Sequence, residues 1–409
     1  MHTTLRGIYQ EMLSPKTVVE TTPFVESCLA RRAETWDQIA KKGKDLRMVD
    51  EITNFTMEVV VHAFLGDYGT DKVQRNCLYL IPEVSKGMLT IPRRFWWPLN
   101  RILPFNFGRA MKARKQFDTM IAGVVEKRRS ELSAMDGAVR TGGALDRMLE
   151  MQEKQLAAGG PMDGEMEYDD IFIYDNICTA LFAGFSTSVA TLTRVLQFLD
   201  SDESKELDLK ARLVEELRGG VTVEESCGKE ESANISTTPR GSSAEGVFRD
   251  LPLLDAVVLE SNRMSPAVGV VFRQAKKAME YNGFLIPKGD LIGWSLSSGY
   301  ASESFYPQPK KFCPFRFLQD EKYVAGASLS NDAMAPAKAL KKQPRPQMFG
   351  FGKHMCPGKE LAKLEIALFL KYFLSNYGYQ LVEGQKLEGS MAGNSPKDGL
   401  RMVLQTISG

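Results

Sequence analysis

The stretch Phe349-Gly350-Phe351-Gly352-Lys353-His354-Met355-Cys356-Pro357-Gly358 places a cysteine between crowded glycines and the start of an amphipathic helical pattern. The helical pattern continues through Leu361, Leu364 and Leu368. Glycines let a backbone approach a flat, bulky group, and the unsatisfied N–H groups at a helix start favour a thiolate. The stretch therefore predicts that Cys356 is a metal ligand or a nucleophile, and the alternative is a buried, inert thiol.

Composition excludes several classes of protein. The 409 residues are 43% hydrophobic and 25% charged, with a net charge of +1, which is ordinary for a globular chain and gives no basic field for nucleic acid. Six cysteines without a CxxC motif, together with only three histidines, argue against a zinc knuckle, an iron–sulfur cluster, a disulfide scaffold or a multi-histidine metal site. This cysteine usage fits a reducing compartment.

Hydrophobic periodicity predicts a mainly α-helical fold with a small β portion. A proline-free run over 168–199 predicts a central helix that crosses the whole protein. Other helices are expected over 24–41, 50–65, 109–132, 145–156 and 251–264. Strands are expected over 268–272, 284–286, 291–296, 378–382 and 400–405.

The middle of the central helix is unusual, because Gly184 should weaken it by ~1 kcal/mol relative to alanine. Small and hydroxyl residues surround this glycine, from Ala183 to Ser188. They leave room for a ligand or allow another helix to pack closely, and the helix pattern by itself favours close packing.

Three segments depart from regular structure. Residues 89–107 are proline-broken, aromatic and basic, which fits a loop on the core or, alternatively, a surface that touches a membrane or forms a substrate mouth. Residues 218–247 are a polar, low-complexity insertion that we expect to be disordered. Residues 325–345 belong to a long irregular region that precedes the cysteine stretch.

Four motifs stand at separate places along the chain. They are Phe349-x-x-Gly352-x-x-x-Cys356-x-Gly358, Glu260-x-x-Arg263, Phe312-Cys-Pro314-Phe-Arg316-Phe317 and Ala183-Gly184-x-Ser186-Thr187. In this order and spacing the chain resembles the cytochrome P450 family of haem-thiolate monooxygenases, over nearly its whole length. The resemblance implies one haem-thiolate catalytic domain over residues 1–409.

The resemblance implies a role for each matching residue around haem b. Cys356 would be the thiolate ligand of the iron, a ligand that favours O–O cleavage, and Phe349, Gly350 and Gly358 would border the haem. Thr187, with Ser186, would help to deliver protons. Ala183 and Gly184 would give oxygen and substrate their space.

The haem propionates need cationic partners, and the resemblance implies four of them. His2 and Arg6 lie four residues apart on one helical face, although His2 is alternatively an unrelated surface residue. Arg273 matches an arginine of the strand that follows the Glu260 helix. His354 stands where most members have arginine, and it can still donate a hydrogen bond, with a charge that depends on pH.

The motifs also imply a buried charge cluster and three departures from the family. Glu260, Arg263 and Arg316 would pair and fix the segment before the cysteine loop. Ser186 replaces the acid that usually precedes the threonine, which puts proton relay through an acid in doubt. Tyr300 stands where histidine is common, and the family's N-terminal part, with its membrane anchor and most of its first sheet, is expected to be missing.

The function that follows is insertion of one oxygen atom from dioxygen into a hydrophobic substrate. Electrons would come from an NADPH-dependent reductase or a ferredoxin, and we expect a monomer. Residues 107–114 and 358–365 look like the branch that oxidises sterols, retinoids and cyclic terpenoids. The full-length form would be membrane-associated, in the endoplasmic reticulum or a plastid, although this chain has no apolar run long enough to span a bilayer.

Three alternatives stay open. A haem-thiolate isomerase or dehydratase acting on peroxides would not need an acid–alcohol relay. A truncated, inactive chain would bind haem poorly. A cysteine-nucleophile hydrolase would need a general base, and neither His62 nor His354 is well placed for that role.

Overall fold

The computed structural model describes residues 2–88, 106–134, 143–161, 166–219, 251–318, 344–387 and 396–407. Predictions about 89–105, about nearly all of 218–247 and about 325–343 therefore lie outside the described residues. The side chain of His2 lies outside them too.

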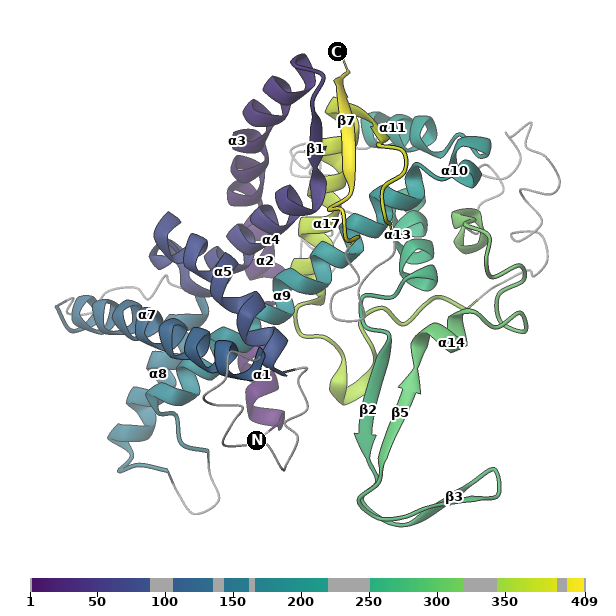
Figure 1. Ribbon diagram of the computed structural model, residues 1–409. Helices are drawn as coiled ribbons and strands as arrows, with labels where there is room; N and C mark the ends of the chain where they lie inside the picture. Colours follow the sequence, from purple (N-terminus) through teal and green to yellow (C-terminus); the bar gives the residue numbers. More distant parts are fainter. Residues whose placement is uncertain are drawn as a thin grey trace, which may run out of the picture.

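Helices make up most of the described chain, as the periodicity predicts (Figure 1). In chain order they are α1 (His2–Met12), α2 (Pro15–Glu20), α3 (Thr22–Lys41), α4 (Met48–Leu65), η1 (Gly66–Tyr68), α5 (Asp71–Met88), α7 (Asn106–Ala134), α8 (Gly143–Ala157), α9 (Asp170–Leu199), α10 (Asp202–Glu206), α11 (Leu209–Gly219), α13 (Pro252–Met264), α14 (Leu296–Tyr300), η4 (Pro314–Phe317), η5 (Gly352–His354) and α17 (Lys359–Asn376). The expected helices are confirmed to within a few residues at each end.

The central helix is α9, which crosses the middle of the molecule in Figure 1. It begins where the Asp169 side chain accepts a hydrogen bond from Phe172 N at 2.7 Å, an N-cap that satisfies one of the free N–H groups of the first turn. Most of its length is buried, and it packs against α4, α5, α7, α8, α13 and α17. Because so many elements pack against α9, a residue of this helix that stays exposed must face a cavity or the solvent.

A cluster of aromatic rings joins α3 to α17, the helix that follows Cys356. The fully buried Trp36 ring meets Phe369 and Phe373 edge-on at centroid distances of 6.0 and 5.6 Å. The indole Nε1 of Trp36 donates to Glu51 Oε2 at 2.9 Å, so the one polar atom of the ring is satisfied. This packing joins α3 to α17, the helix that follows the cysteine loop.

The strands form three small antiparallel sheets. They are β1 (Asp45–Arg47), β2 (Val270–Gln274), β3 (Met279–Tyr281), β4 (Phe284–Ile286), β5 (Leu291–Ser295), β6 (Tyr377–Leu381) and β7 (Arg401–Thr406). The sheet order is β1-β7-β6 in one sheet, and β2 pairs with β5 and β3 with β4. The strand expected at 268–272 is displaced to Val270–Gln274, because its register is set by pairing with Leu291–Ser295. The sequence did not indicate β1, which has only three residues.

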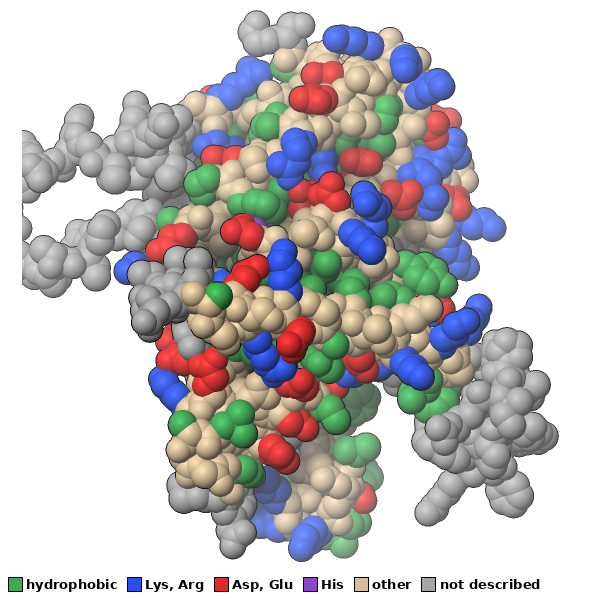
Figure 2. All heavy atoms as spheres, turned by 90° about the vertical axis from the view of Figure 1, so that its left-hand side faces the viewer, with side chains coloured by type: hydrophobic (Ala, Val, Ile, Leu, Met, Phe, Trp, Pro, Cys, Tyr) green, Lys and Arg blue, Asp and Glu red, His purple; other side chains and the backbone are tan. Residues whose placement is uncertain are grey.

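Charge is spread over the face shown in Figure 2 without a field of one sign. On the face shown in Figure 2, basic and acidic side chains are interspersed, in keeping with the net charge of +1. Within the described part of the chain, no helix has the length and apolar character needed to cross a membrane.

Candidate active site

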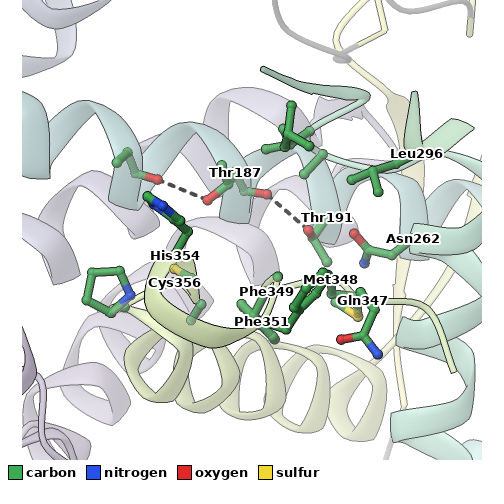
Figure 3. A pocket seen from close by; sticks show the side chains of 18 of the residues that line it. Thr187, Thr191, Asn262, Leu296, Gln347, Met348, Phe349, Phe351, His354 and Cys356 are labelled. Atoms are coloured by element: carbon green, nitrogen blue, oxygen red, sulfur yellow. Dashed lines mark hydrogen bonds between the residues drawn. The ribbon is translucent and has the colours of Figure 1, made fainter. Parts of the chain in front are cut away.

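A cavity of about 1000 Å³ lies between α9, the cysteine loop, the start of α17 and the β2–β5 ladder. This volume is at the upper end of the range for small-molecule sites. Figure 3 shows the arrangement, with Thr187 on α9 in the upper part of the view and Cys356 on the loop below it. The predicted site residues from two distant parts of the sequence therefore meet at one cavity.

One face of α9 forms the cavity wall. The lining residues of this helix fall at helical spacing: Thr179, Ala180, Ala183, Gly184, Thr187, Ser188 and Thr191. Ala183 is exposed although most of α9 is buried, because it faces the cavity. The small side chains at this face leave the space that a bulky ligand needs.

Gly184 has two structural consequences. Its backbone lines the cavity, and a Cβ added at this position would lie 2.8 Å from both Cγ atoms of Val60 on α4. Real Cβ atoms do not approach other atoms this closely, so Gly184 allows α4 and α9 to pack closely. The helix pattern favoured this explanation.

The two hydroxyl residues expected to deliver protons lie in different environments. Thr187 lines the cavity, and its Oγ1 donates to Ala183 O at 3.0 Å. Ser186 is not among the residues that line the cavity, and its Oγ donates to Phe182 O at 2.8 Å within α9. The shared role expected for Ser186 and Thr187 stays a prediction, and of these two residues Thr187 is the one that lines the cavity.

The cysteine loop is held by backbone hydrogen bonds. Cys356 N donates to Phe349 O at 2.8 Å, and Met355 N donates to Gly352 O at 3.2 Å. Gly350 and Gly352 adopt φ values of 66° and 62°, in the left-handed region that other residues rarely enter. The glycines thus allow the tight path that brings residues 349–358 around the cavity.

The Cys356 side chain is exposed to this cavity. The other described cysteines, Cys28, Cys77, Cys178 and Cys313, are buried, and burial raises their thiol pKa values to between about 11 and about 12. Partial burial also raises the pKa of the Cys356 thiol, and the Gly358 N–H lowers it in part. The N–H at the start of the helix thus favours the thiolate, in the direction that the sequence predicts, while burial opposes it.

Cationic side chains gather at the same cavity. Arg273, Lys353 and His354 line it, and Arg345 lines it while pairing with Asp255. Arg273 Nη1 donates to Phe272 O at 2.8 Å. These groups are placed to receive an anionic ligand, and the predicted roles of Arg273 and His354 stay predictions.

Arg6 acts on the loop itself. Its Nη1 hydrogen-bonds to Lys353 O and lies 3.4 Å from Met355 O. Arg6 is not among the residues that line the cavity, although these contacts place its guanidinium beside the loop that carries Cys356. The arginine therefore fixes the first helix against the cysteine loop.

The predicted charge cluster is confirmed. Glu260 Oε2 accepts from Arg263 Nε at 2.8 Å, and Glu260 Oε1 accepts from Arg316 Nε at 3.0 Å. All three side chains are at most 5% exposed. Cys313 N donates to the same carboxylate at 3.0 Å, so the cluster anchors the segment around η4 to α13.

Tyr300 extends this cluster to the segment before the cysteine loop. Its carbonyl accepts from Arg263 Nη1 at 2.9 Å, and its hydroxyl accepts from Gln347 N at 2.9 Å. The tyrosine that departs from the expected histidine thus connects the buried charges to residue 347, two positions before Phe349.

Two further polar residues line the cavity without having been assigned a role from the sequence. Ser188 Oγ donates to Glu365 Oε1, which joins α9 to α17, and both side chains are buried. Glu365 shares the face of α17 with Leu361, Leu364 and Leu368 at helical spacing. A carboxylate within this apolar helical pattern was the feature of the sequence that could have identified Glu365 as a site residue.

Haem fits the residues that the structure brings together. The exposed Cys356 sulfur supplies the soft, anionic donor that iron accepts. The glycine-rich loop and the small face of α9 leave a predominantly apolar cavity, and Arg273 and His354 lie at its wall. Cys356 would therefore hold the iron, and the cations at the cavity wall would receive the propionates.

Known proteins resemble the chain throughout its length. The family model described as "Cytochrome P450" matches residues 4–402. Abscisic acid 8'-hydroxylase CYP707A1 of Solanum lycopersicum is 25% identical over 385 residues, covering 93% of this chain and 67% of the relative. Beta-amyrin 11-oxidase of Glycyrrhiza uralensis is 25% identical over 368 residues, covering 88% of this chain and 63% of the relative. This chain thus spans about two thirds of the length of these relatives.

The fold is similar to solved structures. The structure described as "Retinoic acid bound cyanobacterial CYP120A1" has a TM-score of 0.71 at 22% identity, covering 98% of this chain and 78% of the other. A structure of CYP102L1 has a TM-score of 0.70 at 18% identity, covering 99% of this chain and 81% of the other. The cysteine loop, the Glu260 cluster and the cavity face of α9 all lie within the residues that the family model matches. The chain belongs to the cytochrome P450 family.

Proposed function

We propose that this chain is the catalytic domain of a haem-thiolate monooxygenase that inserts one atom of dioxygen into a bulky, apolar substrate. The observation that carries the proposal is the exposure of Cys356 to a large cavity whose opposite wall is the Thr187 face of α9. Bound haem would supply the activation of dioxygen, and the protein supplies the ligand, the orientation and a dry site.

Each protein group has a separate task in this proposal. Cys356 would hold the iron at one wall, and Ala183 and Gly184 keep the opposite wall free of large side chains. Thr187 presents a hydroxyl oxygen at this wall while its proton is engaged with Ala183 O. The Glu260 cluster anchors the segment around η4 to α13 and takes no part in the chemistry.

Isoprenoids and sterols are the proposed substrate class. Abscisic acid, beta-amyrin and retinoic acid, which the descriptions of similar proteins name, are isoprenoids. The cavity wall of this chain supports the same class, since it includes Val60, Phe64, Val271, Ile292 and Leu296. Electrons would come from a separate NADPH-dependent reductase or ferredoxin, with residues 89–107 as the proposed contact with a membrane.

The test is incorporation of labelled oxygen. Haem-loaded protein, a reductase, NADPH and ¹⁸O₂ are incubated with a panel of isoprenoids and, for comparison, straight-chain fatty acids. The proposal expects products that carry one ¹⁸O atom, formed only when the reductase is present. Conversion of an organic peroxide without reductase or dioxygen would instead establish the isomerase or dehydratase activity.

A further inference from the structure

Most of the large apolar side chains that are exposed in the described part of the chain lie between residues 268 and 355. Many of them belong to the β2–β5 ladder, whose strands run side by side in Figure 1, or to the β3–β4 hairpin. Phe272 on β2 is 63% exposed, and Leu291 on β5 is 72% exposed. A concentration of exposed apolar side chains marks an interaction site, so the ladder is where a partner is expected.

The two faces of the ladder differ. Val271 and Arg273 of β2 line the cavity. Because successive side chains of a strand point to opposite faces, Phe272 between them lies on the outer face. There its ring covers the cross-strand neighbour Gly293, since a Cβ added at Gly293 would lie 3.1 Å from that ring. The outer face is therefore separate from the cavity.

The hydrogen bonds of the ladder show which backbone groups of β2 are left over. Ala275 follows β2 directly, and its N–H donates to Asp290 O, on the β5 side, at 2.9 Å. In an antiparallel pair, the residues that bond to the neighbouring strand alternate along the chain. The odd-numbered residues of β2 therefore bond to β5. The N–H and C=O groups of Val270, Phe272 and Gln274 point to the opposite edge.

This edge of β2 is open. In the described part of the chain β2 pairs with β5 alone, and the carbonyl of Phe272 accepts instead from the side chain of Arg273, at 2.8 Å from Nη1. Edge strands are commonly protected by a proline, a bulge or a charged side chain. The outer face of β2, with Val270, Phe272 and Gln274, carries none of these.

The open backbone groups decide which kind of partner fits. The hydrocarbon of a lipid bilayer offers no donor or acceptor, so burying an unpaired strand edge in it is costly. An added strand satisfies the same N–H and C=O groups through main-chain hydrogen bonds, and its side chains contact the apolar neighbours. The partner is therefore a polypeptide strand.

β2 is complementary to a second copy of itself. In an antiparallel pair centred on Phe272, this residue faces Phe272 of the other copy, and Val270 faces Gln274. All outward-pointing groups are then paired, whereas a register centred on either neighbour of Phe272 leaves one residue unpaired. The aromatic pair adds a favourable cross-strand contact. Lys276 faces the uncharged Val268, so no like charges meet.

We propose that two copies of this chain associate through their β2 edges into a two-fold dimer. The two ladders then form one continuous sheet in the order β5-β2-β2-β5, and the same edge serves both copies, as closed two-fold symmetry requires. Pairing also stabilises the ladder, because a two-stranded ribbon is marginally stable by itself. The dimer does not depend on the proposed function, and it differs from the monomer expected from the sequence.

The first experiment is sedimentation velocity of the full chain over a range of concentrations, in which wild type should dimerise. Phe272→Lys and Phe272→Glu each place two like charges opposite each other at the two-fold axis, and each should dimerise several-fold more weakly. An equal mixture of these two variants should restore association, because the facing charges are then opposite. Phe284→Lys is the control, since it alters a phenylalanine that is 75% exposed on β4 and should behave as wild type.

The second experiment locates the interface by amide hydrogen exchange. In the dimer the amides of Val270, Phe272 and Gln274 should be protected. They should exchange freely in Phe272→Lys and in diluted wild type, while the amides of Val271 and Arg273 stay protected by β5. Dilution makes the comparison without a substitution, so it holds even if the lysine variant does not fold.

Four results would overturn the proposal. Wild type could stay monomeric at every concentration, or the edge amides could be protected in a monomer because another segment of the chain covers them. Phe272→Lys could dimerise as well as wild type, which would place the contact elsewhere. The mixture of lysine and glutamate variants could stay monomeric while both are folded, which would exclude the two-fold register.

Discussion

Cys356 N donates a hydrogen bond to Phe349 O at 2.8 Å, which closes the loop that presents the thiol to the cavity. The bond requires the positive φ values of Gly350 and Gly352, because a side chain would strain the backbone at either position. The loop geometry thus follows from two glycines, and it leaves the Cys356 side chain exposed at the cavity wall.

Replacing Gly350 should weaken haem binding more than replacing a glycine outside the loop. Gly350→Ala forces a β-carbon onto a backbone at φ 66°, which costs of order 1–3 kcal/mol. We expect slower haem incorporation and a lower melting temperature. Gly289→Ala is the matched control, because Gly289 also has a positive φ, 97°, in a turn far along the chain from the loop. An equal loss of bound haem in both variants would contradict the account.

Breaking the Glu260 cluster should destabilise the fold strongly. Glu260→Ala leaves the buried guanidinium groups of Arg263 and Arg316 without their carboxylate, and removal of one partner of a buried pair costs roughly 3–5 kcal/mol. Glu83→Ala is the control, since Glu83 pairs with the exposed Lys86 and such pairs contribute roughly 0–1 kcal/mol. Urea unfolding measures both, and similar losses in the two variants would rule out a stabilising role for the cluster.

The close packing of α9 on α4 predicts coupling between Gly184 and Val60. Gly184→Ala gains ~1 kcal/mol of helix propensity but meets the stiff Val60 side chain at 2.8 Å, and overpacking costs about 1–3 kcal/mol. We expect net destabilisation that Val60→Ala relieves in the double variant. Unfolding free energies of the four proteins give the coupling energy, and additive effects would show that the two residues do not constrain each other.

The buried acid predicts how stability depends on pH. Because the folded pKa of Glu365 is raised from 4.5 to about 8, the folded chain holds a proton in this interval that the unfolded chain has lost. Wild-type stability therefore falls as pH rises through this window, by at most about 5 kcal/mol from this residue. Glu365→Gln lacks this loss and should become the more stable protein above the window. Parallel curves for the two proteins in denaturant unfolding at several pH values would refute buried protonation.

Local patterns in the sequence were sufficient for much of the fold. The proline-free run predicted α9, and the three-residue spacing of Glu260 and Arg263 predicted a pair that the structure confirms. The displacement of β2 was not predictable, since pairing with the distant β5 sets its register. Short strands such as β1 depend in the same way on distant partners.

The site could be predicted from the sequence where one residue type carries the chemistry. It was less predictable where the rotation of a helix determines which side chains reach the cavity. Cys356 was identified from its glycines and the helix behind it. Ser186 received its expected role from the resemblance, because it stands where an acid usually precedes the threonine, whereas Ser188 is the serine that lines the cavity. Glu365 had a visible signal within the leucines of α17, but its meeting with Ser188 depends on how α9 and α17 pack.

The central claim is that Cys356 holds haem iron as a thiolate. The measurement that tests it most directly is the absorption spectrum of the purified, haem-loaded protein after reduction and exposure to carbon monoxide. The account predicts the red-shifted Soret band of a thiolate-ligated haem in wild type, and its loss in Cys356→Ser, while Cys313→Ser, which alters a buried thiol, retains it. A wild-type spectrum without that band, or an unchanged band in Cys356→Ser, would contradict the account.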